Sequence, residues 1–510
     1  MNIKKTFNKN FDSETIVKMS KQFNLDAKII ELLFSRGVDT QEKVKSFLSP
    51  TKQDILDSFL LNDMQLLVDR INQAIKSNEK VLIFGDYDVD GICATAIMIK
   101  LFEHFGKKVD YFLPNRFIDG YGLTNEVIDK IKIQFNPSLI ITVDCGISCW
   151  KEVEYAKSVG IEIAITDHHE ISEKLPETIV VNAKIENQKY PFKFLCGAGL
   201  AYKIAYAFLG YEDSIELLTI ATFATIADIV PLLSENRTLV SLGLKYLPTH
   251  LPLGLKSLIK KNKLDISNLT SSDISYKLAP KINASGRMGE ASDSLDLILE
   301  NNPLKIKEII EKINSHNLNR QDLCNKVFAE AVDLLKEKNM SKIRCIILKS
   351  DKWDSGILGI IAARLVDMFN RPTFLFSETD GELKGSGRSL ENINIHEMLT
   401  SSSELLSTFG GHTMAAGLSL SAKNYDAFCE KIDKYMQINV NDMLLEKNAY
   451  YDLDVTPNEL TPKFLNDLNR LEPFGCENQK PLVKLNSQNF SIFPLKKFPQ
   501  HANIEFDKKI

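Results

Sequence analysis

The sequence VLIFGDYDVDG, residues 81–91, places three aspartates directly after a short apolar run. Its first four residues form an apolar run typical of a buried β-strand, and the apolar segment 92–105 is typical of a helix. Asp86, Asp88 and Asp90 therefore crowd at the carboxyl end of a strand, where α/β proteins bind their ligands. Carboxylates this close repel one another, and a divalent metal ion is the usual way to hold them together.

An alternation of strands and helices continues beyond this stretch. We expect strands at 81–84, 109–113, 139–143, 161–166 and 179–181. Helical patterns separate most of them, at 92–105, 125–133 and 148–159, and two later helices are expected at 198–208 and 215–227. This pattern is typical of a parallel sheet that is covered on both faces.

The rest of the sequence predicts smaller parts. Residues up to about 75 have the period of small helices, and 303–339 predicts one long helix or a helical pair between two domains. A second α/β pattern at 345–376 leads to the glycine-rich segment 384–389. From about residue 449 the sequence alternates as strands do, which predicts a small β region.

The bulk composition is that of an ordinary globular protein. The chain has 510 residues, 44% hydrophobic and 25% charged, enough for two to four domains. A net charge of −5 gives no overall attraction to phosphate backbones, so nucleic-acid binding requires a local basic groove. Eight scattered cysteines predict reduced thiols. Without a signal-peptide core or a bilayer-spanning window in the sequence, we expect a cytoplasmic protein with no membrane partner.

Three other segments place reactive side chains at similar positions. Asp144 follows one expected strand, His168 and His169 follow another, and Asp228 lies in a strongly apolar segment. Each alone has an ordinary explanation, because a strand-end Asp is more often a helix N-cap, a His pair is often a surface or structural feature, and a buried Asp can be hydrogen-bonded in a core. Together they favour a metal site. Mixed Asp and His ligation suits Mn²⁺ better than Ca²⁺, and one bridging carboxylate can hold two ions about 3.5–4 Å apart for phosphoester hydrolysis.

These motifs resemble those of the DHH phosphoesterase family. The resemblance rests on GDYDVDG at 85–91, VDCG at 143–146, DHH at 167–169 and AD at 227–228. GSGRS at 385–389 and GGHTMAAG at 410–417 are similar to the DHH-associated (DHHA1) domain. PNR at 114–116, GYG at 120–122 and NASGR at 283–287 are similar to motifs of the family's single-strand-specific exonucleases.

The resemblance implies a hydrolase that degrades single-stranded DNA 5′→3′ to nucleotides with two Mn²⁺ or Mg²⁺ ions, in DNA repair and recombination. It implies metal ligation by Asp88, Asp90, Asp144, His168 and Asp228, with Asp144 bridging, and catalytic support from Asp86 and His169. It implies DNA or phosphate contacts from Arg116, Tyr121, Arg287, Ser386, Arg388 and His412. The implied partners are single-stranded DNA with a 5′-phosphate, a helicase and a single-strand-binding protein.

The phosphate contacts have a physical rationale. In the segment 385–389 we expect glycines to let backbone amides approach a phosphate, which Arg388 grips bidentately and Ser386 also binds. With Arg116 they hold the 5′-phosphate, and Arg287 meets a phosphate near the cut. On its own, the Ser-Gly-Arg-Ser sequence is more typical of an ordinary turn. Tyr121 between glycines is suited either to stacking on a base or to core packing.

We therefore predict an α/β fold in five parts. A parallel-sheet DHH domain (76–300) follows an N-terminal helical segment (1–75), and a long helix (301–340) joins it to a smaller α/β DHH-associated domain (341–440). The final OB-like β region (441–510) is short for a complete barrel. Asp354 stands where the family usually carries a His, and an acid there is not expected to contact DNA.

Three alternatives differ in testable ways. A hydrolase of short oligonucleotides or cyclic dinucleotides is usually shorter and lacks the C-terminal β region. A DNA-binding scaffold with an inactive site has damaged ligand positions, whereas all five expected ligands are present here. A receiver-like fold with a magnesium-binding acid cluster does not explain the His pair or the second domain.

Overall fold

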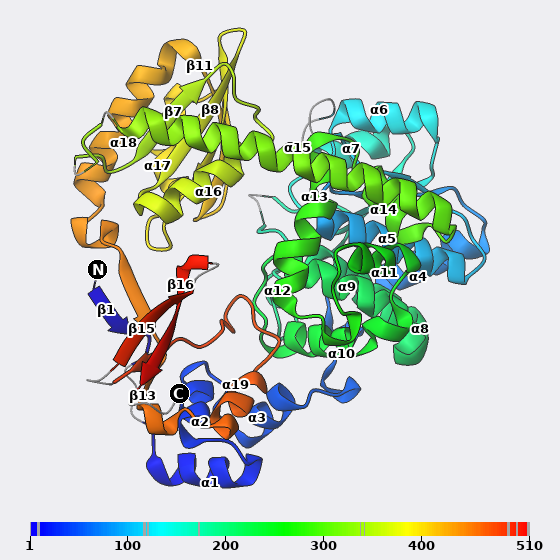
Figure 1. Cartoon of the computed structure of the whole chain (residues 1–510). Helices are drawn as coiled ribbons and strands as arrows, with labels where there is room; N and C mark the ends of the chain where they lie inside the picture. The colour runs from blue at the N-terminus through cyan, green and yellow to red at the C-terminus, as the bar shows by residue number, and fades with distance from the viewer. Residues whose placement is uncertain are drawn as a thin grey trace. The chain divides into compact units, whose positions relative to one another are not determined.

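The computed structural model describes residues 2–7, 11–115, 119, 122–171, 174–336, 338–340, 342–486, 490–495 and 498–506. The chain divides into two compact units. The first comprises Lys4–Gly286, Glu290–Ile313 and Tyr450–Ile510, and the second comprises mainly Asn314–Ala449 with Arg287–Gly289. A single helix, α15 (Pro303–Lys336), continues from the first unit into the second, as the sequence predicted (Figure 1).

The first unit is built around a five-stranded parallel sheet in the order β3-β2-β4-β5-β6. The strands are β2 (Val81–Gly85), β3 (Asp110–Phe112), β4 (Leu139–Val143), β5 (Glu162–Thr166) and β6 (Ile179–Val181). All five lie where the sequence predicted strands, and their parallel pairing confirms the predicted α/β class.

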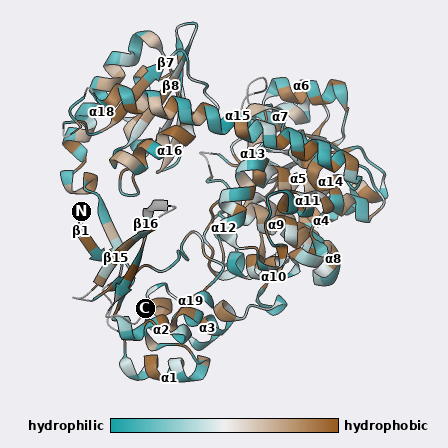
Figure 2. Ribbon diagram, in the orientation of Figure 1, coloured by the Kyte–Doolittle hydropathy of each residue, from teal (hydrophilic) through white to brown (hydrophobic). Residues whose placement is uncertain are grey.

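Both faces of this sheet are buried. Along β2, Val81 and Ile83 pack into one hydrophobic core while Leu82 and Phe84 pack into the other. The first core is shared with α4 (Met64–Lys76), α5 (Val89–His104), α8 (Gly197–Asp213) and α9 (Ile215–Ala227). The second is shared with α6 (Asn125–Gln134) and α7 (Trp150–Ser158). Brown hydrophobic residues accordingly run along α5 and α9 in Figure 2. Burial on both faces explains why these strands are continuous apolar runs.

Further helices extend this unit. They are α10 (Ser234–His250), α11 (Leu253–Lys261), α12 (Ser271–Asp273), α13 (Ala279–Met288) and α14 (Ser292–Leu299). Among the described residues, no helix combines the length and apolar character needed to cross a bilayer. All eight cysteines are free thiols, as expected from their scattered positions.

The N-terminal helices of the first unit share a core with its C-terminal segment. Apolar side chains of α1 (Ser13–Phe23), α2 (Ala27–Ser35) and α3 (Gln41–Leu48) pack with those of residues 453–485. That segment contains β13 (Leu453–Val455), α19 (Pro462–Asn469) and β14 (Val483–Leu485), followed by the antiparallel strands β15 (Phe490–Leu495) and β16 (Phe498–Phe506). No local pattern in the sequence predicts this contact, and the domain boundaries expected from the sequence stay predictions.

The second unit has a mixed five-stranded sheet in the order β10-β11-β9-β8-β7. The strands are β7 (Ile346–Ser350), β8 (Thr373–Thr379), β9 (Glu382–Arg388), β10 (Thr408–Gly411) and β11 (Ala415–Ser421). One core lies against α15 and α16 (Leu358–Phe369), and the other against α17 (Ile395–Thr400) and α18 (Tyr425–Asn439). The short strands β1 (Asn2–Lys5) and β12 (Asn448–Tyr451) complete the inventory.

The glycine-rich segment of this unit corrects one expectation. Residues 385–388 are neither a turn nor a phosphate-binding loop but part of β9, which pairs with β8 on one side and β11 on the other. A Cβ on Gly385 would lie 2.5 Å from the ring of Phe376, and one on Gly387 would lie 2.7 Å from the ring of Phe374. These glycines therefore make room for aromatic core packing, while the backbone bonds its neighbouring strands.

Candidate metal centre

The acidic stretch forms a tight connection between β2 and α5. Asp88 is the N-cap of α5, and its Oδ1 accepts hydrogen bonds from the amides of Asp90 (2.9 Å) and Gly91 (3.2 Å). A Cβ on Gly91 would lie 2.5 Å from the backbone of Asp86, so only glycine allows this close approach. The three carboxylates are thus held at the carboxyl end of β2, as the sequence predicted.

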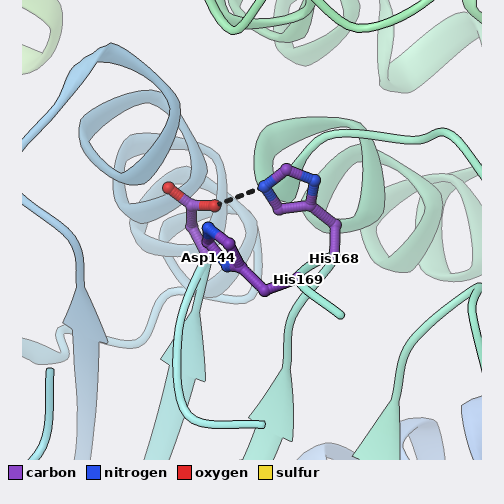
Figure 3. A group of neighbouring side chains, drawn as sticks. All are labelled: Asp144, His168 and His169. Atoms are coloured by element: carbon purple, nitrogen blue, oxygen red, sulfur yellow. Dashed lines mark ion pairs between the residues drawn. The ribbon is translucent and has the colours of Figure 1, made fainter. Parts of the chain in front are cut away.

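Asp144 and the His pair follow the two neighbouring strands. Asp144 comes directly after β4 with a φ of 63°, and its amide donates to Thr166 O at 3.0 Å. His168 lies just beyond β5, and its Nε2 is 3.1 Å from Asp144 Oδ1. Figure 3 shows Asp144, His168 and His169 with their side chains gathered at the ends of the strands. A non-glycine residue at positive φ is uncommon, and such strain is concentrated at functional sites.

The possible ligand atoms fall into three overlapping groups, each with its atoms within 4.8 Å of one another. The groups are Asp86, Asp88 and Asp144; Asp90, His168 and Asp228; and Asp144, His168 and His169. His168 Nε2 also lies 3.7 Å from carboxylate oxygens of Asp90 and Asp228. Because Asp144 and His168 each belong to two groups, the arrangement has the donors of two adjacent cation sites.

One observation tests whether a cation fits. Asp144 Oδ1 is buried and makes no hydrogen bond with the described residues, although His168 Nε2 is near. A buried anionic oxygen without such a donor is costly unless a cation or proton neutralises it. The donors are carboxylate oxygens and imidazole nitrogens, which suit Mn²⁺ and also accept Mg²⁺. The residues present therefore fit divalent cations.

The protonation behaviour of the metal-free site reflects the same crowding. Burial, and then the neighbouring charge of Asp88, raise the pKa of Asp86 to about 8. Burial and nearby aspartates also raise the pKa values of Asp144 and Asp228 well above the ordinary range. Burial lowers the pKa of His168, which favours the neutral imidazole that a metal ion needs.

His169 is oriented by a carboxylate that the sequence analysis did not single out. Its Nδ1 lies 2.7 Å from Oδ1 of Asp167, whose Oδ2 accepts the amide of Ile147 at 2.9 Å. Burial opposes ionisation of both groups, but their hydrogen bond and mutual attraction raise the pKa of His169 and lower that of Asp167. The side-chain amide of Asn182 donates to His169 O at 3.0 Å. A carboxylate-bound histidine of this kind has a fixed ring orientation.

The N-terminus of α8 is a second feature that sequence reasoning missed. The amides of Gly197 and Ala198 donate to the two carboxylate oxygens of Asp90, at 2.6 and 2.8 Å. A Cβ on Gly197 would lie 2.5 Å from the Cβ of Asp144. The only signal in the sequence is the stretch CGAG at 196–199 before an apolar helix, and it does not show what the helix approaches.

The second unit carries the expected phosphate-binding residues on β9. The guanidinium of Arg388 donates from Nη1 to Ser386 Oγ at 3.2 Å, and a Cβ on Gly359, in the first turn of α16, would lie 2.6 Å from Arg388 Nη2. Arg388, Ser386 and the start of α16 are therefore adjacent, and a helix N-terminus favours anions. Asp354 Oδ1 accepts the amide of Gly356 at 2.7 Å within its own loop.

The structure describes only two of the other four residues that were expected to contact DNA. Arg287 Nη1 donates to Gly356 O at 3.4 Å, which places it beside the loop that precedes α16. His412 is exposed in the turn between β10 and β11, where Ala415 pairs with Arg388. Arg116 and Tyr121 lie outside the residues that the structure describes. The roles of all these residues stay predictions.

Comparison with known proteins identifies the family. The family model of the DHH family's N-terminal domain matches residues 80–227, the DHHA1 domain matches 339–438, and the RecJ OB domain matches 451–509. The single-stranded-DNA-specific exonuclease RecJ of Escherichia coli (strain K12) is 30% identical over 476 residues, covering 88% of this chain and 82% of that protein. The chain belongs to the RecJ family. RecJ of Bacillus subtilis (strain 168) is 35% identical over 475 residues, which is 92% of this chain and 60% of the relative.

Solved RecJ structures agree with the fold and the cation chemistry. The crystal structure of RecJ with Mn²⁺ from Thermus thermophilus has a TM-score of 0.86 and 25% identity, covering 100% of this chain and 73% of that chain. A second RecJ structure bound to manganese is 29% identical with a TM-score of 0.66, over 76% of this chain and 97% of the other. The expected Mn²⁺ or Mg²⁺ cofactors therefore match both the relatives and the acidic and His groups here.

Proposed function

We propose that this RecJ-family protein is an exonuclease that degrades single-stranded DNA from the 5′ end to nucleotides with two divalent cations. The observation that carries the proposal is the set of three overlapping ligand groups, in which Asp144 and His168 each belong to two groups. Relatives of 30–35% identity named single-stranded-DNA-specific exonucleases support the substrate. The chain spans about 60% of the Bacillus subtilis relative, so the whole protein's activity and partners belong to this proposal.

In the proposed mechanism the residues of the metal centre would hold two cations, and other residues bind the DNA strand. Asp88, Asp90, Asp144, His168 and Asp228 would hold the cations, and Asp144 belongs to two of the ligand groups. When bound, the cations supply an acidified water and neutralise charge on the phosphoryl oxygens. Asp167 fixes the ring of His169, and Asp86, at the same cluster, supports the ligands.

The second unit is proposed to bind the 5′ end. Ser386 and Arg388 are neighbours that donate to a terminal phosphate, and Arg287 binds a phosphate near the cut. Arg116 and His412 add donors to this binding, and Tyr121 stacks on a base. In this interpretation the metal centre cuts, and the arginines select a strand that begins with a phosphate.

Digestion of labelled DNA tests the proposal. A long single strand with a 5′-phosphate should be shortened from that end with Mn²⁺ or Mg²⁺, and a chelator should stop the reaction. Degradation of a dinucleotide while the long strand stays intact would identify an oligonucleotide hydrolase instead. We also propose a role in DNA repair and recombination in the cytoplasm, with a helicase and a single-strand-binding protein as partners. Co-purification tests the two partnerships.

A further inference from the structure

Residues 86–90, which carry the three acids and connect β2 to the first turn of α5, form a loop that is held by a helix distant in sequence. The amide of Val89 donates to the side-chain oxygen Oδ1 of Asn283, in α13, at 3.0 Å. Val89 is the first residue of α5, and first-turn amides of a helix have no acceptor within the helix. Asn283 therefore satisfies an amide that lies between two of the proposed ligands.

This contact divides the helix-start amides between two acceptors. Asp88 Oδ1 takes the amides of Asp90 and Gly91, and Asn283 takes that of Val89. If Asn283 lost its oxygen, the Val89 amide would have to turn toward another acceptor, and the loop itself is rich in carboxylates. Competition for those carboxylates would disturb the geometry that a cation needs.

The same helix contacts the loop at a second point. A Cβ on Gly286 would lie only 2.3 Å from the carbonyl oxygen of Tyr87, so the backbone of α13 rests directly against the loop. One residue earlier, Ser285 Oγ donates to Ile282 O at 2.7 Å and lies 2.5 Å from Ser294 Oγ. Ser285 thus links α13 to α14 through its hydroxyl group.

We propose that Asn283 and Gly286 are positioning residues of the metal centre, acting through the backbone of residues 87–89. Asn283 holds the Val89 amide, which keeps Asp88 and Asp90 aimed at the cations, and Gly286 permits the close contact with Tyr87. The inference rests on the proposed two-cation function. It also gives a role to the start of the NASGR motif, whose last residue is a proposed phosphate contact.

Mn²⁺ affinity of the full chain, measured by titration calorimetry, tests the inference without DNA. Asn283→Ala should weaken binding by about 10–100-fold, the usual effect of removing a residue that orients a ligand. Asn283→Asp should restore most of the affinity because it keeps an oxygen at the same position. Ser285→Ala is the matched control, and should lower the unfolding temperature while leaving Mn²⁺ affinity unchanged.

Amide exchange of the metal-free protein gives a second measurement. The segment around Val89 should exchange faster in Asn283→Ala than in the wild type, Asn283→Asp or Ser285→Ala. Wild-type Mn²⁺ affinity in Asn283→Ala, or equal losses in Asn283→Ala and Ser285→Ala, would overturn the inference. A wild-type protein that binds Mn²⁺ and loses affinity as expected, but leaves single-stranded DNA intact, would support the positioning role and refute only the nuclease function.

Discussion

Asp144→Asn replaces the central carboxyl group of the carboxylate cluster with a neutral amide of nearly the same shape. An oxygen of Asp144 lies within 4.8 Å of oxygens of both Asp86 and Asp88. Two ionised carboxylates at that separation would repel by about 3.5 kcal/mol with an effective dielectric constant of about 20, which favours proton uptake by the folded, cation-free site. Proton uptake relieves part of this repulsion, because burial and Asp88 raise the pKa of Asp86 to about 8. We therefore expect the metal-free variant to be more stable than the wild type at pH 7, by about 2–4 kcal/mol.

The expected gain in the free energy of unfolding of Asp144→Asn should increase with pH. Burial, and then Asp90 and Asp88, raise the pKa of Asp144 well above the ordinary value of 3.8. A carboxyl whose pKa is higher in the folded state than in the unfolded state destabilises the fold as the pH rises above the unfolded value, until the folded pKa is passed. The advantage of Asp144→Asn should therefore be small near pH 4 and increase toward pH 8.

Urea denaturation with a chelator, repeated at several pH values, measures this difference in the free energy of unfolding. Adding Mn²⁺ should stabilise the wild type by mass action and should stabilise Asp144→Asn much less, because the variant lacks a carboxylate that belongs to two of the candidate ligand groups. The variant should also release no nucleotides from single-stranded DNA. A metal-free variant that is less stable than the wild type at pH 7, or that gains equally from Mn²⁺, would refute the reasoning.

Three further predictions concern other parts of the protein. Gly197→Ala places a Cβ 2.5 Å from that of Asp144, and calorimetry should show Mn²⁺ affinity lowered by about tenfold or more. Lys203→Met leaves the buried Glu235 without its ion-pair partner at 2.8 Å. Urea denaturation should show that the free energy of unfolding falls by about 3–5 kcal/mol. The double variant Lys203→Met, Glu235→Gln should recover most of this loss. Arg388→Ala should reduce the preference for 5′-phosphorylated over 5′-hydroxyl strands by roughly 10–100-fold, because a charged hydrogen bond is worth about 1.5–3 kcal/mol. The dependence of the rate on Mn²⁺ should not change. Equal digestion of both strands by the wild type would contradict the proposed role of Arg388.

The parallel sheet could be predicted from the sequence because its strands carry a strong local signal. β4 and β6 begin and end at the predicted residues, and β2 and β5 differ from prediction by one residue at one end. Each is a short apolar run buried on both faces, bounded by polar or glycine residues. Acids at the ends of such strands meet at one edge whatever the connections are, so the convergence of Asp86, Asp88 and Asp144 could also be predicted.

Features that depend on distant contacts could not be predicted in this way. The glycines at 385 and 387 carry the same local signal in a phosphate loop and in a strand, and only the rings of Phe376 and Phe374 distinguish the two. The approach of Gly197 to Asp144 and the hydrogen bond from Val89 to Asn283 likewise join segments separated by more than fifty residues. Neither the hydrophobic periodicity of the sequence nor the spacing of its motifs indicates which distant residues are in contact.

Two helix starts stabilise two of the carboxylates of this acid cluster. Asp88 accepts two first-turn amides of α5, and Asp90 accepts two amides at the start of α8. Each helix N-terminus carries roughly half a positive charge, so both carboxylates are already stabilised by the fold. Asp144 Oδ1 has no comparable donor among the described residues and must be neutralised by a proton or a cation. Substitution of Asp90 should therefore impair folding as well as metal binding. Substitution of Asp144 should impair metal binding and leave folding intact.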